Sequence, residues 1–216
     1  MGELVIVCCH AICLPDCDPY EESSWLLKSF QRSNPSTGKP GEHETFLLHI
    51  QAGVNALRRE GTILIFSGAK TERNAPFSEA LSYLNVLKQC FGGSDFVRQA
   101  MAEGRVHIEA DATDSYQNLL FSLIKYYEIE DKWPQMITVI THAFKENRFL
   151  VRVKQINLLD SMLTRAGWPR SCIGIAQRED TRARDQPSLS FAGVARSATT
   201  REGYCRPVLE RPSRSS

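Results

Sequence analysis

Side chains that can do chemistry end four short apolar runs of this 216-residue sequence. In chain order they are Cys8, Cys9 and His10, then Ser67 and Gly68, then Glu109, and finally Thr141 and His142. Imidazole and carboxylate groups transfer protons, and hydroxyl groups bind polar ligands. These groups can serve one site only if the four runs end side by side. Whether these side chains form one site therefore depends on the secondary-structure elements that carry them.

Five apolar runs rich in β-branched residues have the continuous pattern of strands that are covered on both faces. They are LVIVCCH (4–10), TILIFSG (62–68), RVHIE (105–109), MITVITH (136–142) and CIGIA (172–176). A helix-length amphipathic segment follows each run except the last. This alternation predicts an α/β fold with a single open, mainly parallel, doubly wound (Rossmann-like) sheet of about five strands. In such sheets ligands bind at the carboxyl ends of the strands.

Two apolar stripes with helical spacing mark helices that pack on this sheet. The first consists of Phe46, Leu47, Ile50, Val54 and Leu57, and the second of Tyr116, Leu119, Leu120, Leu123, Ile124 and Tyr127. Asp114, with Gln117 three residues later, resembles a capping box at the start of the second helix. We interpret His43, His49 and His107 as surface or packing residues.

The loop after the second predicted strand offers the best anion site in the sequence. Ser78 is a natural N-cap, and the helix behind it presents free amides and the positive end of its dipole. Lys70, Thr71 and Arg73 lie in the loop that leads to this helix. The alternative is a solvated loop with an ordinary cap.

Glu109 forms an acidic cluster with Asp111 and Asp114 at the end of the third run. Neighbouring carboxylates can divide into a general acid and a general base or hold a divalent cation. The alternative for the two aspartates is that they complement the helix dipole. Ser115 and Asn118, off the apolar stripe of the following helix, are expected to point back towards the strand ends.

His142 ends the fourth run, and Lys145 and Arg148 follow at a spacing of three residues, which makes one helix face basic. Histidine titrates near neutral pH, so His142 can be an acid, a base or a ligand contact, with a structural histidine as the alternative. We predict Glu109 and His142 as the catalytic residues.

Several familiar motifs do not occur in the sequence. It contains no G-x-G-x-x-G, no G-x-x-x-x-G-K-[ST] and no G-x-S-x-G, so it lacks the dinucleotide, P-loop and hydrolase-elbow patterns. The cysteines between positions 8 and 17 lack the spacing of a zinc knuckle, and we predict no metal site. Cys8 and Cys9 are better explained as buried strand residues.

The charge and composition of the chain limit the kinds of partner that it is expected to bind. The 26 Lys and Arg against 25 Asp and Glu leave a net charge of +1, so nucleic acid is not an expected partner. The sequence contains no run of 18 apolar residues, so we predict no membrane span. The seven cysteines lack the pattern of a disulfide-rich secreted protein, which favours a location in the cytoplasm. The polar, arginine-rich composition of residues 177–216 predicts a disordered basic tail after one domain at 1–176.

Four separated motifs, SGAKT, SEALSYL, EADATDSYQNLLFSL and THAFKENRF, together resemble the fungal branch of the SanA/YdcF-like proteins, the domain of unknown function 218. The resemblance covers about residues 4–176. It implies an open α/β, nucleotide-binding-like fold with a polar pocket, and it supplies no reaction. The family's motifs fall on Ser67, Gly68 and Ala69, on Ser78, Glu79 and Ala80, on Glu109 and Asn118, and on Thr141, His142, Lys145 and Arg148.

The chain departs from that family's pattern at three positions. Ala69 replaces a glycine, Ala143 stands where an acidic residue is common, and Val153 stands where a histidine is expected. Alanine at position 69 would strain a turn that requires a positive φ. A missing second histidine would affect catalysis more than binding.

Together these features predict a cytoplasmic protein that binds a small anionic molecule, phosphorylated or nucleotide-like. If it is an enzyme, the expected reaction is hydrolysis or group transfer. The predicted ligand-binding residues are His10, Ser67, Gly68, Lys70, Thr71, Ser78, Glu79, Ser115, Asn118, Thr141, Lys145 and Arg148. The residues identify no cofactor, and S-adenosylmethionine and other nucleotides stay open as candidates. The alternatives are a non-catalytic binding or interaction module and an inactive member of the family.

Overall fold

A computed structural model describes residues 2–72, 74–151 and 173–175 of the chain, and the structural statements below concern these residues. The predicted tail at 177–216 lies outside them, as do Arg73 and Val153. None of the helices in the described ranges combines the length and the apolar character needed to cross a bilayer.

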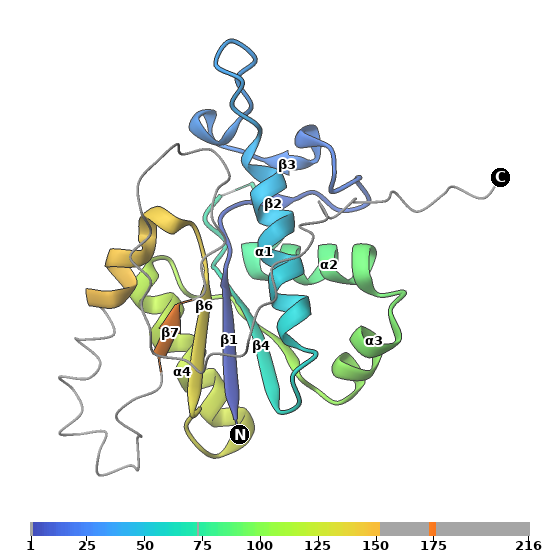
Figure 1. Cartoon of the computed structure of the whole chain (residues 1–216). Helices are drawn as coiled ribbons and strands as arrows, with labels where there is room; N and C mark the ends of the chain where they lie inside the picture. Colours follow the sequence, from blue (N-terminus) through green and yellow to red (C-terminus); the bar gives the residue numbers. More distant parts are fainter. Residues whose placement is uncertain (1, 73, 152–172, 176–216) are drawn as a thin grey trace, which may run out of the picture. The chain divides into compact units, whose positions relative to one another are not determined.

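Five parallel strands form the central sheet (Figure 1). They are β1 (Glu3–Cys8), β4 (Thr62–Ser67), β5 (Val106–Glu109), β6 (Met136–Ile140) and β7 (Ile173–Ile175). Their order in the sheet is β5-β4-β1-β6-β7. The central strand β1 is buried along its whole length, because it has a strand on each side and helices on both faces. The predicted α/β fold with a mainly parallel sheet is confirmed.

Helices cover both faces of this sheet. On one face, α1 (Glu42–Ala56), α2 (Glu79–Phe91) and α3 (Asp95–Ala102) pack on the β1 and β4 side chains Val5, Val7, Leu64 and Phe66. On the other face, α4 (Ser115–Glu130) and the helical residues 146–151 pack on Leu4, Ile6, Ile63 and Ile65. Figure 1 shows α1, α2 and α3 on the side of the sheet opposite α4.

The strand order creates a switch point between β1 and β6. From β1 the chain builds β4 and β5 on one side, and it then crosses to β6 on the other side of β1. The connections on the two sides lie on opposite faces of the sheet, so they separate at the carboxyl ends of β1 and β6. In open α/β sheets this is where ligands bind. His10 follows β1 there, and Thr141 and His142 follow β6.

The long connection from β1 to α1 carries a small antiparallel pair, β2 (Ile12–Cys13) and β3 (Trp25–Leu26), and two short 3-10 turns, η1 (Glu22–Ser24) and η2 (Ser29–Gln31). It extends beyond the carboxyl ends of the sheet strands in Figure 1. Trp25 anchors it: the indole is 3% exposed and its ring centroid lies 5.6 Å from that of Phe46 on α1.

Both predicted helix starts are present, and one detail of the prediction is wrong. Ser78 Oγ accepts the Leu81 amide at 3.1 Å, and Asp114 Oδ1 accepts the amides of Tyr116 and Gln117. The Gln117 side chain accepts the amide of Thr113 instead of that of Asp114, so the reciprocal capping box does not form.

The apolar stripe predicted for α4 is shifted. Leu119 and Leu123 are buried as expected, and Ser122 and Tyr126 complete the buried face, whereas Ile124 and Tyr127 are 44% and 39% exposed. The buried face includes two small polar residues, Asn118 and Ser122, so counting apolar residues alone rotates the stripe. By contrast, all five residues of the first predicted stripe are buried, four of them on α1 and Leu57 at its C-cap.

Candidate ligand-binding site at the strand ends

Glu109, Ser67 and Asn118 form a buried polar network at the ends of β4 and β5. Glu109 Oε2 lies 2.5 Å from Ser67 Oγ, and Ser67 Oγ lies 2.9 Å from Asn118 Oδ1. The other Glu109 oxygen accepts the backbone amides of Asp111 and Ala112 at 2.7 and 3.0 Å. A hydroxyl donates only one proton, so Ser67 donates either to Glu109 Oε2 or to Asn118 Oδ1.

Cys8, at the end of β1, connects this network to the switch point. Its register partner on β4 is Ser67, and its fully buried thiol interacts with the side chains of Asn118 and Thr141. Burial raises the pKa of the Cys8 thiol to about 12. The thiol is therefore protonated at neutral pH, which fits a packing residue with a weak polar contact and not a nucleophile.

His10 joins β1 to the segment that follows β6. Lys145 Nζ lies 3.1 Å from His10 Nδ1, and Thr141 Oγ1 lies 3.3 Å from His10 Nε2. An ammonium group can only donate, so His10 Nδ1 accepts from Lys145 and the ring proton is on Nε2, facing Thr141. Burial, aided by the charges of Lys145 and His142, holds the pKa of His10 well below its usual value. His10 is therefore neutral.

Three imidazole rings gather at the switch point. His142 stacks on His10 with ring centroids 4.5 Å apart, and His49 on α1 lies 5.3 Å from His142 and 6.0 Å from His10. Burial lowers the pKa of His49 to about 3, and its Nδ1 has no hydrogen-bond partner in the described part of the chain. His49 is thus a buried packing residue, and its ring contacts place it against His10 and His142. Its place in the sequence, three residues after Phe46 of the apolar stripe, already indicated that His49 lies on the buried face of α1.

Lys145 in the short turn η3 (Ala143–Lys145) is a partly buried cation. Burial is the main cause that lowers its pKa, and the charge of Arg148 adds to it. Among the described residues no carboxylate lies within ion-pair distance of the Lys145 ammonium, whose one hydrogen bond there goes to neutral His10. Arg148, three residues later, is exposed.

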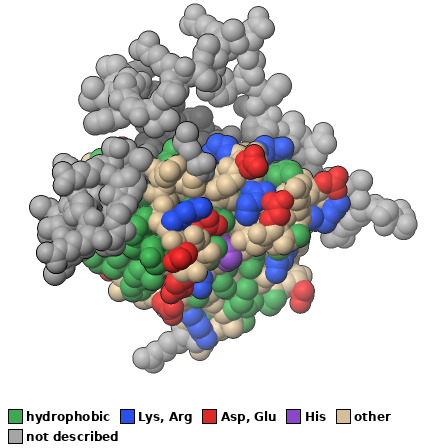
Figure 2. Space-filling model, turned by 90° about the horizontal axis from the view of Figure 1, so that it is seen from below, with side chains coloured by type: hydrophobic (Ala, Val, Ile, Leu, Met, Phe, Trp, Pro, Cys, Tyr) green, Lys and Arg blue, Asp and Glu red, His purple; other side chains and the backbone are tan. Residues whose placement is uncertain are grey.

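At the opposite end of the sheet, basic side chains are paired with carboxylates. Figure 2 looks at that end, where the strands begin, and acidic and basic side chains are interspersed there. Arg59 forms an ion pair with buried Glu3 at 2.6 Å, and Lys132 pairs with Glu130 at 3.1 Å. Lys145 differs from these cations because its neighbour is a neutral imidazole.

Glu42, the first residue of α1, brings a carboxylate to His142. The Glu42 Oε2 to His142 Nε2 distance is 3.8 Å, and Glu42 also lies 3.7 Å from Lys39 Nζ. No local pattern indicates this contact, because Glu42 follows Gly41 in a polar segment 100 residues before His142.

The start of α2 does not provide the predicted anion site. The amides of Glu79 and Ala80 donate to the carbonyls of Ala69 and Gly68, and the Leu81 amide donates to Ser78 Oγ, so the first turn has no free donors. The buried Glu79 carboxylate accepts the Thr71 hydroxyl at 2.6 Å and would repel an anion. Burial raises the pKa of Glu79.

The remaining predicted residues have simpler surroundings. Lys70 is exposed in the loop after β4. Ser115 is half-buried at the start of α4, and its side chain makes no hydrogen bond within the described ranges. Ala69 has no left-handed backbone, so the strain expected from an alanine there does not occur.

Gly68 is required by close packing. A Cβ at this position would lie 2.9 Å from Cys9 Cβ and 3.1 Å from Glu79 Oε2. The Gly68 amide donates to the Glu109 carbonyl, and its carbonyl accepts the Ala80 amide. The tight turn thus holds β4, β5 and α2 together beside the Ser67 network.

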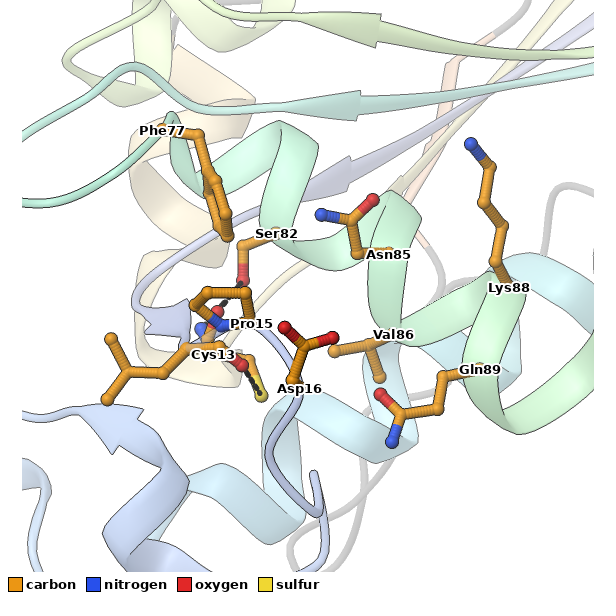
Figure 3. Close-up of a pocket in the computed structure, with 10 residues that line it drawn as sticks. Cys13, Pro15, Asp16, Phe77, Ser82, Asn85, Val86, Lys88 and Gln89 are labelled. Atoms are coloured by element: carbon orange, nitrogen blue, oxygen red, sulfur yellow. Dashed lines mark hydrogen bonds between the residues drawn. The ribbon is translucent and has the colours of Figure 1, made fainter.

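A pocket of about 570 Å³ lies on the flank of α2, beside β2 (Figure 3). Apolar Pro15, Phe77 and Val86 line it together with polar Asp16 and Gln89. The hydroxyl of Ser82, which also lines it, is already bonded to the backbone of Cys13. The pocket shares no residue with the strand-end cluster of His10, Thr141, His142 and Lys145.

Comparison with known proteins gives one relative without an assigned activity. The chain is 27% identical over 201 residues to Uncharacterized protein YOR238W of Saccharomyces cerevisiae, a match that covers 76% of this chain and 66% of that protein. The chain thus spans about two thirds of the relative's length. No protein-family profile matches the chain, and no solved structure matches it.

Proposed function

We propose that the protein binds a small phosphorylated molecule at the carboxyl ends of β1 and β6, with Lys145 as the residue that contacts the phosphate. The observation that carries this proposal is the partly buried Lys145 ammonium, which is hydrogen-bonded to neutral His10 and has no carboxylate within ion-pair distance among the described residues, although Glu79 and Glu42 act on it from farther away. A bound anion would compensate the unfavourable burial of this charge. The position at the topological switch point supports the proposal independently.

In this proposal the two predicted catalytic residues have different roles. Glu109 is a positioning residue, because it is 6% exposed and both of its oxygens accept hydrogen bonds from its own chain. His142 is the acid–base group of a hydrolase or group transferase. It lies beside the Lys145 contact, and its Nε2 is 3.8 Å from the Glu42 carboxylate.

A thermal-shift screen tests the proposal. The panel contains orthophosphate, ribose 5-phosphate, other sugar phosphates, nucleoside monophosphates and S-adenosylmethionine. A ligand at 100 times its Kd adds about 2.7 kcal/mol of stability, which raises the Tm of a domain of this size by roughly 5–10 °C. We expect a phosphorylated compound to shift the wild type and not Lys145→Met. The proposal fails if no anion shifts the wild type, or if the shift is unchanged in Lys145→Met.

A further inference from the structure

Phe144 ends a column of three stacked rings that begins inside the strand-end cluster. His10 and His142 stack at 4.5 Å with an interplanar angle of 29°, and Phe144 stacks on His142 at 5.3 Å with an angle of 17°. Phe144 directly precedes Lys145 in η3.

Phe144 is also the most exposed large apolar side chain in the described part of the chain, at 70%. One face of its ring covers His142, so the exposed area includes the other face. An aromatic ring fixed on one side and open on the other is a preformed stacking surface, because the conformational cost of ordering it has already been met in folding.

We infer that the phosphorylated ligand is a nucleotide whose base stacks on the open face of Phe144 while its phosphate contacts Lys145. This inference rests on the proposed function and specifies its ligand class. A ring of the size of a nucleobase gains by stacking on an aromatic side chain whatever its identity, because every base has a π-face. Arg148, exposed three residues after Lys145, offers a second cation for a longer phosphate chain.

The test separates the base from the phosphate. Isothermal titration calorimetry measures the Kd of AMP, GMP, CMP, UMP and ribose 5-phosphate for the wild type, Phe144→Ala and Phe144→Trp. Phe30→Ala is the matched control, because Phe30 is 65% exposed and takes part in none of the ring contacts of the cluster. Since Phe144 is exposed, its replacement leaves the core intact.

We expect at least one nucleotide to bind more tightly than ribose 5-phosphate. Phe144→Ala should weaken that nucleotide roughly 5- to 150-fold, the range found for loss of a base-stacking side chain, without affecting ribose 5-phosphate. Phe144→Trp should retain binding, and Phe30→Ala should match the wild type. Equal affinity for ribose 5-phosphate and all four nucleotides, or an unchanged Kd in Phe144→Ala, overturns the inference while leaving the phosphate site intact. Absence of binding by every phosphate compound refutes both.

Discussion

The turn at Gly68 offers a sharp test of how the site is built. In Gly68→Ala, the new methyl group would lie 2.9 Å from Cys9 Cβ and 3.2 Å from Glu79 Cβ, where ordinary contacts are 3.4–4 Å. Neither neighbour is a flexible side-chain end, so the backbone of the turn must move. Overpacking of this kind costs about 1–3 kcal/mol, and it is partly offset by about 0.4–1 kcal/mol because alanine restricts the unfolded chain.

Gly93→Ala provides the matched control, since a Cβ there meets nothing within 4 Å. Both variants share the effect on the unfolded chain, so the difference between them isolates the clash. Urea unfolding followed by circular dichroism should show Gly68→Ala less stable than Gly93→Ala by about 1–3 kcal/mol. Equal unfolding free energies would show that the turn is not packed as described.

Two further variants test local features of the same region. Ser78→Ala should cost about 0.5–2 kcal/mol because it removes the cap of α2, whereas Ser94→Ala, at an N-cap that makes no side-chain bond, should cost little; equal losses in urea unfolding would contradict the assigned cap. Because the pKa of His49 is about 3 in the folded protein and 6.5 in the reference state, the unfolded chain takes up the proton first as the pH falls, and stability is lost below pH 6.5. At pH 5 this amounts to about 2 kcal/mol, so His49→Leu should lose less stability between pH 7 and pH 5 than the wild type. An unchanged acid sensitivity in His49→Leu would refute the neutral assignment.

The sheet and the edge that carries the site were predictable from the sequence, because strands covered on both faces must be continuously apolar and parallel strands end on the same edge. Ser67 and Glu109 follow from that rule, and Asn118 follows from its place off the apolar stripe of the next helix. The sequence could not show which predicted cations meet an acceptor. Lys70 and Lys145 both follow strands, and only the fold shows that Lys70 faces solvent while Lys145 lies against His10.

Other features depended on contacts distant in the chain. The α2 amides are bonded because the turn at Gly68 and Ala69 folds back on the helix start, and no local pattern indicates this. The contacts of His49 and Glu42 with His142 join α1 to the end of β6 across about 100 residues. The stripe on α4 was misplaced because Asn118 is buried for its hydrogen bond to Ser67 and not for apolar character.

Two lysine variants show whether Lys145 binds the phosphate of the ligand. The substitutions Lys145→Met and Lys70→Met each remove one positive charge, the first from the strand-end cluster and the second from the exposed loop after β4. Calorimetric titration measures the Kd of ribose 5-phosphate for each variant. We predict a roughly 10- to 150-fold weaker Kd for Lys145→Met, because a hydrogen bond to a charged group is lost. For Lys70→Met we predict a change below about fivefold, as for an exposed charge. Equal affinity of the two variants, or a larger loss in Lys70→Met, would show that Lys145 does not contact the phosphate.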